Sequence, residues 1–92
     1  MKIVINRCYG VFNISEDAAR ELKIPAKEAE YLRASPFLID LIETYGSQVV
    51  SGEGAQLKVV EIPDDVDNWK ILEEGGWETL EYEKSGQFSL VN

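Results

Sequence analysis

The spacing of hydrophobic residues changes along the chain and indicates where strands and helices lie. Residues 3–5 form a continuous β-branched run, IVI, and Gly10 follows it, so a strand is predicted over residues 2–8. A strand without polar alternation is typical of a buried, central position in a sheet. Beyond it the apolar residues recur at helical spacing as far as Gly46, and short β-type runs return from Gln56 onward.

Helices are predicted in the first half of the chain. Ser15 is an N-cap residue followed by two acidic residues, and a short helix-forming stretch over 26–33 comes after it. Ser35 precedes a proline, which favours a helix start, and Gly46 is placed to end that helix. One face of this helix is apolar: Phe37, Leu38, Leu41, Ile42 and Tyr45. The glycine-containing stretch 47–54 is predicted as a loop.

Strands dominate the second half. A strand over 56–62 ends at a proline, and residues 69–73 and 77–82 are predicted as a hairpin joined at Glu74-Gly75-Gly76, because paired glycines supply the positive φ angles of a tight turn. The residues from Gly86 to Asn92 form either a last short strand or a loose end.

These elements predict an α+β fold, with the helices of the first half packed on one face of a small, mainly antiparallel sheet. The sheet is expected to contain the first strand, the 56–62 strand and the hairpin. A length of 92 residues, 45% of them hydrophobic, predicts one domain over residues 1–92. The sequence leaves the strand order and the oligomeric state open.

The compartment is predicted from three features of the sequence. The apolar runs are far shorter than the roughly 20 residues of a membrane span. The N-terminus lacks the pattern of a secretory signal, and the single cysteine, Cys8, cannot form an internal disulfide. We therefore expect a cytoplasmic protein that does not enter membranes.

The charge is strongly asymmetric. Residues 1–46 carry seven acids and six bases, whereas residues 47–92 carry ten acids and three bases, which gives −1 and −7 of the total −8. Nine carboxylates lie between Glu61 and Glu83 against the single Lys70. This field repels phosphates and attracts basic protein surfaces, so direct binding of nucleic acid is disfavoured.

Three segments of the sequence resemble a family of short uncharacterised proteins of phages and prophages. They are MKIVINRCYGVF at the start, SPFLIDLIETYG in the middle and AQLKVVEIPDDV later. Members of that family open like MKIVIN-x-CYGGF, with Val11 here in place of the second glycine, and carry a similar LKVVEIPDDV segment. The likeness weakens after Trp69. The resemblance implies a phage context and brings no activity, cofactor or catalytic residue.

Catalysis is not predicted. The chain contains no histidine, so Cys8 lacks the usual general base for nucleophilic catalysis, and it is either a structural cysteine or a reactive thiol. The acidic turn around Asp65 has a tryptophan and a lysine where a calcium loop needs an oxygen ligand and glycine, and one cysteine does not make a zinc site. No metal or cofactor is expected.

Two binding surfaces are predicted instead. The leading one is the acidic segment, whose carboxylates form an interface together with nearby aromatic residues. For the two tryptophans the alternative is packing in the core. The predicted partner-binding carboxylates are Asp64, Asp65, Asp67, Glu73, Glu74, Glu78 and Glu81. The alternative is a small-ligand site at the exit of the first strand, formed by Asn6, Arg7 and Tyr9, in which Arg7 binds an anion and Tyr9 offers a stacking face. These residues otherwise form a structural turn.

These surfaces correspond to different functions. The acidic segment indicates an inhibitor of a host protein with a basic surface, for example a defence protein, with the carboxylates mimicking nucleic-acid phosphates. The strand exit indicates a small-ligand binder that sequesters a nucleotide-derived signal. An accessory or structural protein of the phage particle is a third hypothesis.

Overall fold

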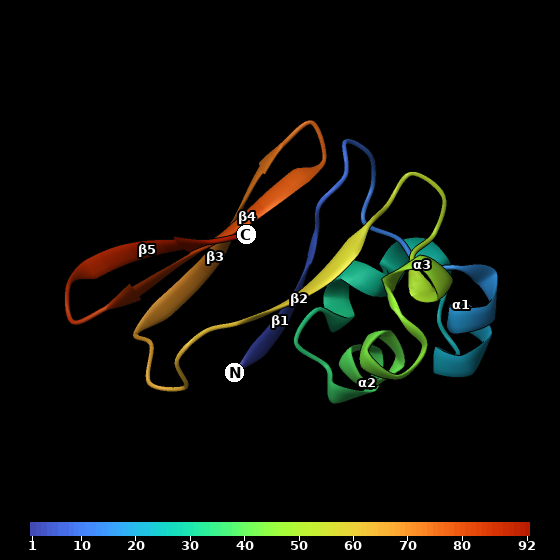
Figure 1. Cartoon of the computed structure of the whole chain (residues 1–92), viewed down its shortest axis with the longest axis horizontal. Coiled ribbons are helices and arrows are strands. Elements are labelled where there is room, and N and C mark those ends of the chain that lie inside the picture. The colour runs from blue at the N-terminus through green and yellow to red at the C-terminus, as the bar shows by residue number, and fades with distance from the viewer.

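The computed structural model describes all residues from 1 to 92 and contains both helices and antiparallel strands, which confirms the α+β prediction (Figure 1). No helix in it is long and apolar enough to cross a membrane. The elements follow one another as β1 (Lys2–Asn6), α1 (Glu16–Leu22), the 3₁₀ helix η1 (Ala26–Leu32), α2 (Pro36–Tyr45), α3 (Ser47–Val50), β2 (Leu57–Glu61), β3 (Asn68–Glu74), β4 (Trp77–Lys84) and β5 (Gln87–Val91).

The strands form two antiparallel sheets and not the single sheet that was predicted. β1 pairs only with β2, in a register that places Val4 opposite Val59, while β3, β4 and β5 form a separate meander. Figure 1 shows β1 and β2 between the helices on one side and the three-stranded sheet on the other. The protein therefore has a helical layer, a two-stranded middle layer and a three-stranded outer layer.

The middle layer is buried on both faces, which explains its continuous hydrophobic run. Val4 and Leu57 pack against the helices in one core cluster, whereas Ile3, Ile5 and Val60 pack against the three-stranded sheet in another. All three residues of the IVI run are fully buried. Burying a side chain of this size contributes about 1.5 to 3 kcal/mol, so β1 is the element that holds the two outer layers together.

Local helix signals act as predicted. The Ser15 hydroxyl accepts a hydrogen bond from the Ala18 amide, and Ser35 does the same for the Phe37 amide. Residues 47–50, predicted as part of a loop, form the one-turn helix α3. Tertiary contacts explain this difference, because Val50 is buried in the core and its carbonyl accepts from the Ser15 amide.

The predicted hairpin is present and continues into a further strand. Gly75 and Gly76 have φ angles of +61° and +94°, as the tight turn requires. A second two-residue turn follows at Ser85-Gly86, so that β5 pairs with β4 from Gln87 onward. The end of the chain is thus a strand, which decides between the two possibilities that the sequence left open.

Candidate functional site

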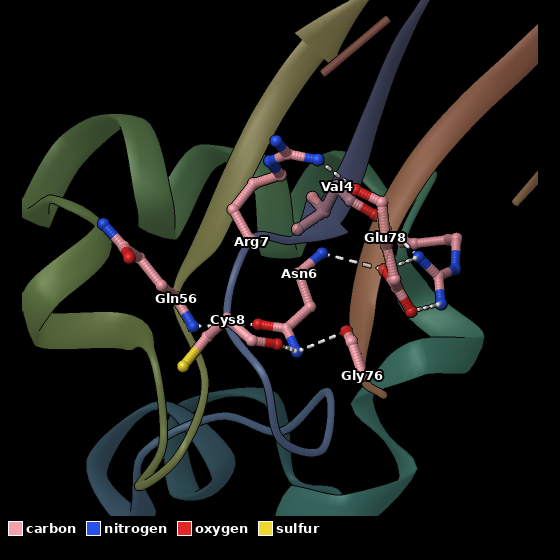
Figure 2. A network of polar contacts seen from close by, with 8 residues as sticks. Val4, Asn6, Arg7, Cys8, Gln56, Gly76 and Glu78 are labelled. Carbon is pink, nitrogen blue, oxygen red and sulfur yellow. Dashed lines mark hydrogen bonds and ion pairs between the residues drawn. The ribbon is translucent and has the colours of Figure 1, made fainter. Parts of the chain in front are cut away.

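Asn6, which was predicted to bind a ligand, instead joins three segments of the protein (Figure 2). It is fully buried, its Oδ1 accepts from the Gln56 amide at 2.9 Å, and its Nδ2 donates to the carbonyls of Cys8 at 3.2 Å and Gly76 at 3.1 Å. Its backbone amide donates to the Glu78 carboxylate at 2.8 Å. With no exposed surface, Asn6 is not available to a ligand. The prediction that Asn6 binds a ligand is therefore wrong, and its role is structural.

Glu78, predicted as part of the acidic surface, is also buried, with 6% of its surface exposed. Both of its oxygens accept from the Arg33 guanidinium, at 2.9 and 3.2 Å. Arg33 in turn donates to the Val4 carbonyl, and its own carbonyl accepts from the Val4 amide at 2.7 Å. The free edge of β1 is therefore closed by an ion pair, and Glu78 does not contribute to a partner-binding surface.

Arg7 clamps the exit of β1 to β4. Its guanidinium lies over the Trp77 ring, 4.2 Å from the ring centroid, and donates to the Glu78 carbonyl at 2.6 Å. That carbonyl lies on the edge of β4 beyond the point where β5 ends, because β5 reaches only as far as Leu80. Arg7 thus occupies a place that a longer strand would fill.

Tyr9 completes this stack. Its ring lies 5.0 Å from that of Trp77, and 74% of its surface is exposed. Neither Arg7 nor Tyr9 lines any of the five principal cavities. Of the three predicted ligand residues, only Tyr9 is freely accessible, and the strand exit is built as a structural joint.

The three-stranded sheet has two different faces. Its inner face packs on the core through Trp69, Ile71, Leu80, Tyr82 and Val91. Its outer face, which we call the outer sheet face, carries the alternate residues, and its apolar members are Leu72, Trp77, Phe88 and Leu90. Phe88 and Leu90 are 66% and 64% exposed. The structure thus separates the two tryptophans, since Trp69 is partly buried against the core and Trp77 lies on the outer sheet face.

Acidic residues surround part of the outer sheet face. A hollow of about 240 Å³ is lined by Leu72, Glu73, Glu74, Trp77, Thr79 and Leu90, with no base among them. Glu73, Glu74 and Glu83 form no ion pair, whereas Glu81 contacts Lys70 at 3.5 Å. An apolar centre beside unpaired carboxylates is a chemical arrangement suited to a partner that is apolar and basic.

The predicted acidic turn after β2 has partners within the protein. Asp64 pairs with the N-terminal ammonium, Asp65 contacts Lys84 at 3.1 Å, and Asp67 accepts from the Ser85 amide at 2.9 Å. All three residues are exposed, so they remain accessible. Reversing them would nevertheless remove contacts that hold the turn and the β4–β5 connection, so they are not a free charged surface.

The hydrogen bond from Lys84 is the largest cause that holds the pKa of Asp65 below its ordinary value, and a backbone hydrogen bond at Asp65 and the charge of Lys84 add to it. A lowered native pKa means that this pair stabilises the protein above the unfolded-state pKa, and that the contribution is lost as the pH falls through the native pKa. We expect Lys84→Ala to raise the pKa of Asp65 in an NMR titration, whereas Lys70→Ala leaves it unchanged. An unchanged pKa in Lys84→Ala would contradict the assignment.

Cys8 is half-buried beside a depression that contains two serines. Their hydroxyls are engaged with β2, since Ser47 donates to the Leu57 carbonyl and Ser51 accepts from the Leu57 amide. No group of three or more potential metal ligands is formed. Neither the thiol nor the serines are joined to a general base in this arrangement.

Comparisons with known proteins do not show a family for this chain. No family model and no solved structure match it. A segment of 56 residues is 43% identical to part of a DNA double-strand break repair Rad50 ATPase of Methanopyrus kandleri. The alignment covers 61% of this chain, and the chain spans only 6% of the length of that curated relative. So short a match shows neither a shared fold nor a shared function.

Sequence reasoning missed the apolar part of the outer sheet face. The signal was present in the alternation of β3, where Leu72 lies on the opposite face from Trp69 and Ile71. Cross-strand pairing then places Leu72 opposite Thr79, and Glu81 opposite Leu90. The pattern was hidden because both faces of this small sheet carry aromatic and aliphatic residues.

Proposed function

We propose that this protein is a small phage-type binding protein that docks on a host protein through its outer sheet face and inhibits it. The observation that carries the proposal is the exposure of Leu72, Phe88 and Leu90 on one face, beside a hollow lined by Glu73 and Glu74 and by no base. Exposed apolar patches bordered by polar residues are common in protein interfaces.

The charge of this surface supports a partner with an apolar centre and a basic rim. The protein carries a net charge of −8, and the carboxylates nearest the hollow are not neutralised internally. Such a field accelerates encounter with a basic partner and weakens as salt is added. A host defence protein with a nucleic-acid-binding surface has this chemistry, and the carboxylates would then occupy the positions of phosphates.

The test uses a double variant of the outer sheet face, Leu72→Ser with Glu74→Lys. We expect it to capture at least about tenfold less partner from a host-cell lysate than the wild type, because it removes an apolar contact and reverses a steering charge. The matched control is Val49→Ser with Glu28→Lys, which makes the same kinds of change at exposed positions of the helical layer. Equal capture by the two double variants would exclude this surface.

Competition with duplex DNA decides the mechanism. Release of the captured partner by DNA supports mimicry of nucleic acid by the carboxylates. If DNA does not release the partner, but Leu72→Ser weakens its binding, the partner is bound through the apolar centre without mimicry of nucleic acid. Circular dichroism of each variant confirms that the fold is intact.

A further inference from the structure

The outer edge of β5 has no cover. Of the 19 backbone hydrogen bonds outside the helices and strand ladders, none involves residues 87–92, and the side-chain contact there is from Lys58 to the Asn92 carbonyl. The edge of β1, in contrast, is closed by Arg33 and Glu78. Unpaired strand edges readily pair with another strand, so proteins normally protect them.

β5 also lacks the charges that usually protect an edge. Residues 87–92 read QFSLVN and contain no charged residue, although 28% of the chain is charged. On the opposite edge of the same sheet, β3 carries Lys70, Glu73 and Glu74. The β5 edge is therefore open to a further strand, while the β3 edge is protected against one.

The hairpin register determines which backbone groups β5 presents. The turn at Ser85-Gly86 has two residues, so Lys84 and Gln87 exchange both of their backbone hydrogen bonds. Bonded pairs alternate with non-bonded pairs along an antiparallel ladder. The amides and carbonyls of Phe88 and Leu90 consequently point away from β4.

We propose that β5 pairs antiparallel with β5 of a second copy of this chain, about a two-fold axis through Ser89. In this register Phe88 lies opposite Leu90 of the second copy, and the outward groups of these residues make about four backbone hydrogen bonds. The two meanders become one continuous sheet. Phe88 and Leu90, each about two-thirds exposed in the single chain, then lie beside their counterparts.

A second copy fits this edge better than it fits the rest of the surface. Two molecules of charge −8 repel each other, so self-association needs a contact that is locally neutral. Residues 87–91 of β5 carry no charged side chain. Of the two carboxylates that the register places beside them, Glu81 contacts Lys70 at 3.5 Å, whereas Glu83 forms no ion pair. This proposal does not depend on the proposed inhibitory function, although the pairing would extend the outer sheet face across both copies.

The test places like charges on the two-fold axis. Sedimentation and light scattering of the wild type, over about 10 µM to 1 mM, are expected to show a mass approaching twice 10.4 kDa. Ser89→Glu and Ser89→Lys should each weaken dimerisation about tenfold or more, because identical charges then lie directly opposite each other. An equimolar mixture of the two variants should restore the dimer.

Gln87 provides the matched control, since in the proposed register it lies opposite Val91 of the second copy and not opposite itself. Gln87→Glu and Gln87→Lys should both remain dimeric. A wild type that stays monomeric at 1 mM overturns the proposal. It is equally overturned if Ser89→Glu alone remains dimeric, or if the mixture stays monomeric while circular dichroism shows that both variants are folded.

Discussion

Replacing Glu78 with alanine is expected to lower the free energy of unfolding by about 3 to 5 kcal/mol, because it leaves the Arg33 guanidinium buried without its carboxylate. The side chains of both residues are largely buried, at 8% and 14% exposure. The same change also removes the acceptor of the Asn6 amide at the end of β1. An unsatisfied buried donor adds to the cost.

Urea unfolding followed by circular dichroism measures this effect. Glu81→Ala is the matched control in the same strand, because Glu81 contacts the exposed Lys70 and should cost no more than about 1 kcal/mol. Replacing both Glu78 and Arg33 with leucine should cost less than the sum of the single changes, since neither charge is then left alone. A cost for Glu78→Ala as small as that of the control would show that the ion pair does not join the layers.

Replacing Gly76 with alanine is expected to cost about 3 to 5 kcal/mol, the sum of backbone strain and overpacking. Gly76 has a φ of +94°, and an added Cβ would lie 1.8 Å from the Gly10 carbonyl oxygen and 2.4 Å from its nitrogen. Both contacts are with backbone, which cannot turn aside as a flexible side chain can. The tip of the β3–β4 hairpin would have to move away from the loop after β1.

Gly75 provides the comparison for Gly76 within the same turn. It too has a positive φ, but its added Cβ would meet only the Tyr9 ring at 3.5 Å, an ordinary contact. Gly75→Ala should therefore cost about 1 to 2 kcal/mol, the strain of a left-handed residue alone. Thermal unfolding monitored by tryptophan fluorescence compares the two variants, and equal costs would rule out a close approach of Gly76 to Gly10.

Both predictions concern the joint between the middle layer and the three-stranded sheet. The hydrophobic contacts in the cluster that contains Leu80 and Ile5 favour packing of the three-stranded sheet on the middle layer. They do not fix the orientation of the sheet, because the hydrophobic effect is not directional. The hydrogen bonds of Asn6 and Glu78 have defined partners and geometry, so we infer that they fix how the sheet lies on β1. A variant that loosens this joint would also displace the outer sheet face.

The sequence by itself determined the elements whose causes are local. Ser15 and Ser35 cap helices through residues two or three positions away, and Gly75-Gly76 permits a turn through its own φ angles. The unbroken run at 3–5 indicated a buried, central strand. Its residues are buried, but the strand is not central, because β1 pairs only with β2. The acidic character of the second half also needed no structure, because it is a sum over residues.

Only the tertiary structure decided which polar residues are buried. Glu78 and Arg33 are 45 positions apart, and Asn6 and Gly76 are 70 apart. Their polar side chains indicate exposure when read alone, since burial costs free energy unless each group finds a partner. The fold supplies those partners by bringing β4 across the end of β1. The division of the strands into two sheets, and the packing of Trp69 against the core while Trp77 lies on the opposite face, likewise depend on contacts between distant segments.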